Sequence, residues 1–274
     1  MFKKILSIFI GAFFIFNLTF TFNISAYCKE KKREDYLKSN FIICIDPGHQ
    51  GKGDPRCEAV SPNSNNMKPR VSSGTAGVAT KNPEHVINLE AALILKDLLI
   101  KNGYTVIMTR ESADVNISNI ERAQIANNAN ADLTIRIHCD SINDSGKTGA
   151  VILVPDKTGE FTKQIYKNSN KYAEILKKKL EENNVKVNGI FERKDITGFN
   201  WSTVPVIIFE MGFMSNYNED KMLSDKTYQM KLMECVSNSI DEYKLLIFLY
   251  NYLHLMQVLL RCFFFIFIKS NTKV

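Results

Sequence analysis

Two histidines and two glutamates stand at positions where this chain of 274 residues could assemble a hydrolytic metal site. His49 follows a short apolar run through a Pro-Gly turn, and His138 and Glu210 each end a further apolar run. Glu84 opens a helical pattern. Because residues that follow parallel strands gather at one edge of an open α/β sheet, we expect these four side chains to converge.

The chemistry of such a cluster would be that of zinc. Two imidazoles and one carboxylate are a zinc ligand set that leaves the fourth position to water. Zinc lowers the pKa of that water to about 7, and a second carboxylate can carry its proton to a leaving amine. The residue types therefore predict amide hydrolysis without a covalent intermediate.

The spacing of these residues does not identify the site by itself. The sequence holds no His-Glu-x-x-His pattern, which is the strongest local signature of zinc. A histidine in a strand can equally be a structural residue whose ring nitrogens are satisfied by hydrogen bonds. Only four histidines occur, and two of them terminate strand-like runs, which favours the metal-ligand interpretation.

The elements that must position these side chains alternate between strand and helix. Strand patterns cover residues 41–46, 104–109, 133–137, 150–154, 187–191 and 204–209. Helical patterns cover residues 84–101, 116–129, 161–182 and 228–243. This alternation predicts a single α/β domain with a mostly parallel central sheet flanked by helices on both faces. Residues 51–82, rich in Gly, Ser, Asn and Pro, are expected to form a long surface loop.

The bulk composition is that of a globular protein, with 45% hydrophobic and 23% charged residues. The net charge of +6 is spread along the chain, which predicts a solvated basic surface; attraction to an anionic matrix or membrane is the alternative. No basic and aromatic module indicates nucleic-acid binding. The six cysteines form no Cys-x-x-Cys pair, so we expect neither a zinc ribbon nor a disulfide framework, with Cys44 and Cys139 in the core.

Both ends of the chain are apolar. Residues 1–26 begin with Lys3 and Lys4 and continue as an apolar run, which is typical of a signal peptide or an N-terminal anchor. Residues 27–40 are a charged linker, and residues 245–274 form an apolar tail that is a candidate membrane segment, although Arg261 would be costly in lipid. We expect a monomer that is secreted or associated with the bacterial cell envelope.

Several motifs, in order, resemble those of the zinc-dependent N-acetylmuramoyl-L-alanine amidases of the bacterial cell wall. They are IDPGHQG at 45–51, Glu84 with Asn88-Leu89, GYTVIMTR at 103–110, the segment 118–126, ADLTIRIH at 131–138 and PVIIFEMGFMSN at 205–216. The resemblance implies a catalytic domain over residues 41–244 with one zinc ion and peptidoglycan as the substrate. It also implies cleavage of the amide bond between N-acetylmuramic acid and L-alanine.

The resemblance implies a role for each of the four residues at the predicted site. His49, Glu84 and His138 match the three zinc ligands of the family. Glu210 matches its catalytic carboxylate, which is expected to activate the zinc-bound water. Glu90 competes with Glu84 for the acidic ligand, but Glu84 keeps the family's offset from Asn88-Leu89, and His85 is expected at the surface.

Three further residues are candidate contacts to the substrate. Arg136 should share a strand face with His138, so it could bind substrate carboxylates; a scaffold salt bridge is the alternative. Asn200 and Trp201 could border the groove and stack on sugar or peptide, and a buried core tryptophan is the alternative. After His138 the family usually has Ala-Asn, where this chain has Cys139-Asp140.

Two other functions compete with the amidase interpretation. One is a non-catalytic cell-wall binding protein that kept the fold, and the other is a different zinc hydrolase of peptidoglycan, such as a carboxypeptidase or a deacetylase. The presence of all four site residues favours an enzyme. Some relatives carry a helix that blocks the zinc, but residues 141–148 are short and polar here, so we expect a cleft that is open without an activator protein.

Overall fold

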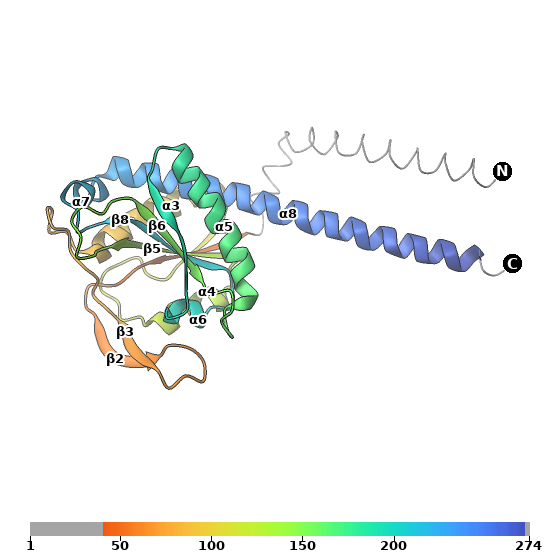
Figure 1. Ribbon diagram of the computed structural model, residues 1–274, viewed down its shortest axis with the longest axis horizontal. Helices are drawn as coiled ribbons and strands as arrows, with labels where there is room; N and C mark the ends of the chain where they lie inside the picture. The colour runs from red at the N-terminus through yellow and green to blue at the C-terminus, as the bar shows by residue number, and fades with distance from the viewer. Residues whose placement is uncertain (1–40, 272–274) are drawn as a thin grey trace. The chain divides into compact units, whose positions relative to one another are not determined.

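The structure is a computed structural model that describes residues 41–271, the last 21 of them as helical backbone only (Figure 1). The predicted signal or anchor segment and the charged linker lie outside the described residues. Within the described part, Cys44, Cys57, Cys139 and Cys235 are free thiols, and the first and third are buried as expected.

Eight strands and six helices make up the described part of the chain. The strands are β1 (Ile42–Pro47), β2 (Asp54–Ala59), β3 (Met67–Val71), β4 (Thr105–Met108), β5 (Leu133–Asp140), β6 (Ala150–Pro155), β7 (Val187–Arg193) and β8 (Val206–Phe213). The helices are α3 (Glu84–Lys101), α4 (Asn119–Asn128), α5 (Lys163–Glu182), α6 (Thr197–Asn200), α7 (Tyr217–Leu223) and α8 (Lys226–Asn271).

The main sheet has six strands in the order β4-β1-β5-β8-β6-β7. Strands β4, β1, β5 and β8 run parallel, whereas β6 is antiparallel to β8 and parallel to β7. The prediction of a mainly parallel sheet in a single α/β domain is confirmed. Because β1, β5 and β8 are parallel neighbours, the segments that follow or end them meet at one edge of the sheet.

The two faces of the sheet are covered by different helices, as Figure 1 shows for α3 and α8 on one side and α4 and α6 on the other. Ile135, Ile137 and Phe209 pack into the large core with α3, α5 and α8. Ile208 packs on the opposite face with Phe199 of α6. Side chains along a strand alternate between the two faces of the sheet, so residues 136, 138 and 210 belong to the face covered by α4 and α6. The site therefore lies on that face.

The segment 51–82 is more ordered than expected, because it contains the antiparallel hairpin of β2 and β3. The prediction of an irregular loop was wrong for these residues. The composition of these residues does not favour strands. The hairpin is instead stabilised by hydrogen bonds to the rest of the domain. The indole N–H of Trp201 donates to the carbonyl of Ala59 at 2.9 Å, and Asn119 donates to the carbonyl of Arg70 at 2.7 Å.

The predicted element boundaries shift by a few residues at several ends. Helix α4 begins at Asn119 rather than at residue 116, because Ser118 and Glu121 form a reciprocal capping box at its start. Strands β5 and β8 continue beyond their predicted ends, so His138 and Glu210 lie inside these strands. The two residues are register partners in the β5–β8 pair.

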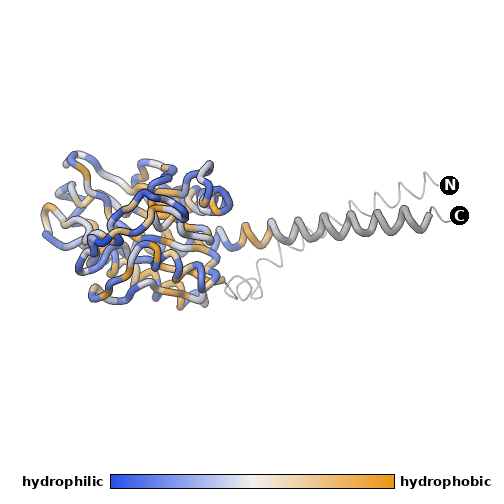
Figure 2. Tube along the Cα trace, turned by 90° about the horizontal axis from the view of Figure 1, so that it is seen from below, coloured by the Kyte–Doolittle hydropathy of each residue, from blue (hydrophilic) through white to orange (hydrophobic). Residues whose placement is uncertain are grey.

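The apolar C-terminal segment continues the last helix of the domain instead of forming a separate feature. Helix α8 runs from Lys226 to Asn271 without interruption. Within the domain, hydrophobic and hydrophilic stretches alternate along the trace, as expected for elements with one face in the core (Figure 2). None of the helices in the described part combines sufficient length with the apolarity that a bilayer span requires.

Candidate metal centre

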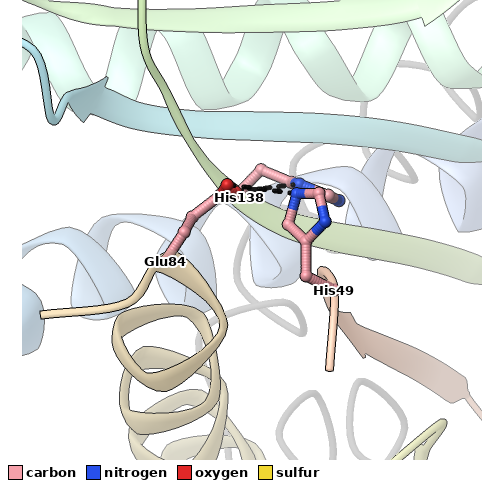
Figure 3. Close-up of side chains that lie close together, drawn as sticks. All are labelled: His49, Glu84 and His138. Atoms are coloured by element: carbon pink, nitrogen blue, oxygen red, sulfur yellow. Dashed lines mark hydrogen bonds and ion pairs between the residues drawn. The ribbon is translucent and has the colours of Figure 1, made fainter. Parts of the chain in front are cut away.

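His49, Glu84 and His138 meet at the edge of the sheet, although the first and the last are 89 positions apart in the sequence (Figure 3). The Nε2 atom of His49 lies 3.1 Å from Oε2 of Glu84, and Nδ1 of His138 lies 3.3 Å from Oε1. One ligand atom from each residue falls within 4.8 Å of the others. The predicted convergence of two imidazoles and an acidic group is therefore present in the structure.

The loop after β1 holds His49 in an uncommon backbone conformation. His49 has a φ of 61°, in the left-handed region that few non-glycine residues adopt. Two buried arginines fix the carbonyls of this loop: Arg110 donates to Pro47 and Gly48, and Arg122 donates to Pro47 and His49. Such backbone strain persists only where the surroundings over-determine it, and it is common at functional sites.

The hairpin fixes the orientation of the His49 ring. Its Nδ1 lies 3.0 Å from the carbonyl oxygen of Ser72, just after β3, and 2.9 Å from the hydroxyl of the same residue. Because a carbonyl can only accept, Nδ1 donates to it and the ring orientation is fixed. The other ring nitrogen, Nε2, then faces Glu84, as in metal sites where a carbonyl orients the ligand histidine.

Glu84 is a buried carboxylate that stays ionised. It begins α3 and accepts hydrogen bonds from the backbone N–H groups of Thr75 and Cys139 and from the side chain of Asn88. Burial alone raises the pKa of Glu84, but the hydrogen bonds from His138 and His49 outweigh it and hold the pKa well below its usual range.

Burial keeps the ring of His138 neutral, which is the form that binds metals. Desolvation lowers the pKa of His138 to about 4 even though Glu84 opposes the shift. Its Nε2 is buried without a hydrogen-bond partner among the described residues. An unpartnered buried nitrogen is uncommon in native proteins and calls for a ligand or another explanation.

The donor set fits a zinc ion. One nitrogen from each imidazole and one carboxylate oxygen lie within 4.8 Å of one another, and two histidines with one carboxylate are a common zinc ligand set.

Glu210 is the second carboxylate of the site, across the β5–β8 pair from His138. Its Oε2 is buried without a hydrogen-bond partner among the described residues. Burial, followed by the charges of Glu84 and Asp140, raises the pKa of Glu210 well above its usual range. A shift in this direction makes the carboxyl group hold a proton more strongly, which suits a group that accepts one from water.

Arg136 forms hydrogen bonds to scaffold residues. Its Nε donates to Asp46 at 2.7 Å and its Nη2 to Asn119 at 2.8 Å. The residue is only 5% exposed, and these bonds support the salt-bridge alternative. Contact of Arg136 with a substrate carboxylate stays a prediction.

Asn200 and Trp201 bind the hairpin. Asn200 donates to the carbonyls of Val60 and Lys194, and the indole of Trp201 donates to Ala59. Their polar groups therefore hold β2 against the domain. Contact of the half-buried Trp201 ring with substrate stays a prediction.

Glu90 and His85, the two competing residues on α3, differ from the predicted metal ligands in their surroundings. Glu90 points toward α8, where Gln229 donates to its Oε2 at 3.3 Å. His85, expected at the surface, is half-buried, and burial lowers the pKa of its ring. Its Nδ1 has no hydrogen-bond partner among the described residues.

Two glycines that sequence reasoning did not assign to the site pack directly against the ligands. A Cβ on Gly48 would lie 2.2 Å from Cε1 of His138, and a Cβ on Gly74 would lie 2.7 Å from Oε2 of Glu84. Gly74 also has a φ of +81°. Gly48 belongs to the IDPGHQG motif, whereas nothing near Gly74 in the sequence marked it.

We predict that Gly48→Ala weakens metal binding by displacing the His138 ring. Disturbing the orientation of a metal ligand costs about 10- to 100-fold in affinity. Competition with a zinc chelator measures that change. Gly51→Ala is the control, since its Cβ would come no closer than 3.0 Å to Ala113 and touches no ligand. Equal zinc affinity for Gly48→Ala and wild type would contradict this account of the packing.

Together, these features define an α/β domain with a candidate metal centre at the edge of its parallel strands and a buried carboxyl group beside it. A family model described as N-acetylmuramoyl-L-alanine amidase matches residues 43–242. The chain therefore belongs to the N-acetylmuramoyl-L-alanine amidase family.

Individual relatives agree with this assignment. The probable cell wall amidase LytH of Staphylococcus saprophyticus is 25% identical over 221 residues, which cover 81% of this chain and 64% of that protein. The probable N-acetylmuramoyl-L-alanine amidase AmiB of Haemophilus influenzae is 28% identical over 261 residues, covering 80% and 53%. The chain thus spans less than two thirds of either relative.

A solved structure supports the fold. The crystal structure of the N-acetylmuramyl-L-alanine amidase Ami1 from Mycobacterium smegmatis matches with a TM-score of 0.68 and 22% identity. The match covers 76% of this chain and 98% of that chain. At this identity the likeness supports the arrangement of strands and helices alone.

Proposed function

We propose that this protein hydrolyses the amide bond between N-acetylmuramic acid and L-alanine in peptidoglycan. The observation that carries the proposal is the meeting of His49, Glu84 and His138 next to Glu210, in a chain of this family. Relatives named as cell wall amidases support peptidoglycan as the substrate. A peptidoglycan substrate in turn places the protein outside the cytoplasm, as the apolar start of the chain predicts.

One zinc ion is the proposed cofactor, with His49, Glu84 and His138 as its ligands. When bound, zinc polarises water and carbonyl oxygens and lowers the pKa of a bound water to about 7. The protein supplies two imidazoles and an ionised carboxylate, and metal binding requires the imidazoles in their neutral form. Ser72 and Asn88 hold His49 and Glu84 in place through hydrogen bonds.

Glu210 is the proposed proton carrier. It takes a proton from the attacking water and delivers it to the amine of L-alanine as that amine departs. Its raised pKa suits both halves of this task, because a carboxylate with an ordinary pKa would hold protons too weakly at neutral pH. Glu210 is the register partner of His138 in the β5–β8 pair, which supports this role.

The reaction can be tested with purified protein and peptidoglycan, with and without a zinc chelator. We expect peptides that carry a free amino group on L-alanine, loss of this product on chelation, and recovery on adding zinc. Mass spectrometry separates this cut from the alternatives: a carboxypeptidase would shorten the stem peptides, and a deacetylase would change the glycan. If no free L-alanine amino group is released under any of these conditions, the proposed function fails.

A further inference from the structure

A cluster of opposite charges joins the hairpin to the outer edge of the sheet. It consists of Lys68 on β3, Arg193 at the end of β7 and Asp195, and we call it the Lys68–Arg193 cluster. Arg193 binds both carboxylate oxygens of Asp195 through Nε and Nη2, at 2.8 and 2.9 Å. Lys68 donates to the carbonyl and to the carboxylate of the same aspartate, at 2.5 and 3.3 Å.

The cluster carries a net positive charge and is open to solvent. Two cations share one carboxylate, which leaves one positive charge without compensation inside the cluster. The side chains of Lys68 and Arg193 are 45% and 43% exposed. The Nη1 atom of Arg193 has no hydrogen-bond partner among the described residues. Asp195 thus orients both cations and leaves donors free for an anion.

The register of the sheet places Arg193 on the same face as the proposed proton carrier. Glu210 pairs with Val151 of β6, and Arg193 pairs with Pro155 of the same strand. Register partners share a face, and so do residues separated by an even number along a strand. Exposed Phe191 lies on this face as well, next to Arg193 along β7, and is 49% exposed.

The charges of these groups also act on one another. Burial raises the pKa of Glu210, and the charge of Arg193 opposes this shift. The hydrogen bond to Asp195 is the largest cause of the raised pKa of Arg193, and the charges of Glu210 and Asp140 add to it. The hairpin provides a second connection to the site, because Ser72, four residues after Lys68, binds the ring of His49. The cluster therefore borders the site on the side of β7.

The reaction assigned to Glu210 decides which part of the substrate lies on this side. Glu210 delivers a proton to the amine of L-alanine, so the peptide begins beside it. The next residue of the peptidoglycan stem is a glutamate linked through its side chain, which leaves its α-carboxylate free. Two residues of extended chain span about 7 Å, so this carboxylate lies within about that distance of the bond that is cleaved.

We propose that the Lys68–Arg193 cluster binds a carboxylate of the stem peptide and so makes the protein prefer acidic over amidated stems. This inference rests on the proposed function and deepens it, because it names the substrate group that is recognised. A planar guanidinium suits a carboxylate better than it suits an amide, since both oxygens of the anion accept hydrogen bonds. The surface salt bridge within the cluster then serves to position the cations rather than to stabilise the fold.

The test compares two soluble muramoyl peptides that differ only in one group, a free carboxylate or an amide on the second residue. For wild-type protein loaded with zinc, KM should be at least about 10-fold lower for the acid than for the amide. This factor corresponds to the usual contribution of a hydrogen bond to a charged group. Arg193→Ala should raise KM for the acid by a similar factor and raise KM for the amide far less, so the ratio of the two KM values should fall toward one. Arg193→Lys should recover part of the preference.

Lys178→Ala is the matched control, because it removes one positive charge from an exposed site on α5 whose partner is Glu182. It should leave the preference for the acid intact. The cluster proposal is overturned if wild type hydrolyses both substrates equally well, or if Arg193→Ala raises KM equally for both. If wild type cleaves neither substrate, the proposed function itself fails, so the two failures are distinguishable.

Discussion

Glu84→Ala is expected to lose the bound metal, whereas Glu210→Gln is expected to keep it and lose activity. Glu84 bridges the two imidazoles and is the only acidic member of the described ligand cluster. Its removal leaves two neutral histidines, which bind zinc far more weakly. Glu210→Gln keeps the size and hydrogen-bonding shape of the side chain but cannot transfer a proton. Removing a general acid or base lowers kcat by about 100- to 10,000-fold.

The measurements are zinc stoichiometry, kcat on peptidoglycan and the melting temperature of each variant. Glu90→Ala is the matched control for Glu84→Ala, because it removes an acidic group from the same helix at a position that contacts α8. It should retain one zinc ion and most of the activity. Full metal occupancy in Glu84→Ala, or full activity in Glu210→Gln, would refute the assigned roles.

Asp46→Asn is expected to destabilise the domain strongly. Asp46 is 1% exposed and receives hydrogen bonds from Thr109, Arg122 and Arg136. Without its charge, two buried guanidinium groups lose their counter-ion. Breaking a buried ion pair by removing one partner costs about 3–5 kcal/mol of folding free energy. Because Arg122 also holds the carbonyl of His49, the variant should bind zinc less tightly.

Urea unfolding in the presence of a chelator measures the change in the free energy of unfolding without the contribution of metal. Glu174→Gln is the control, because its partner Lys171 and Glu174 itself are both more than half exposed. Exposed pairs of this kind contribute little, so the control should unfold like wild type. If Asp46→Asn unfolds like the control, the buried network does not support the fold as described.

The same aspartate should give the stability of the protein an acid dependence. Burial raises the pKa of Asp46, but the charges of Arg122 and Arg136 and the hydrogen bond from Thr109 outweigh it and hold the pKa well below its usual range. A group with a lowered pKa contributes stability above its unfolded pKa of about 3.9, and this contribution is lost as the pH falls toward the folded value. Below about pH 4, the free energy of unfolding should therefore fall less steeply with decreasing pH in Asp46→Asn than in wild type.

The sequence by itself determined the α/β class, the strands that form the sheet and the residue types of the site. Strands β1, β5 and β8 are buried on both faces, so their apolar runs are long and easy to recognise. Helix α3 begins and ends where its periodicity and Gly103 predicted. These features depend on the local pattern of apolar residues and on burial, and both can be recognised in the sequence itself.

Tertiary contacts decided the rest. The β2–β3 hairpin has little strand propensity and is stabilised by bonds from Asn119 and Trp201, more than 45 residues away along the chain. Arg136 shares the face of His138, as its alternation predicts, but its salt bridge depends on the position of Asp46 on the next strand. The need for glycine at position 74 arises only when Glu84 and His49 pack against it. Each of these features depends on contacts between segments that are far apart in the sequence. Local sequence patterns do not contain information about such contacts.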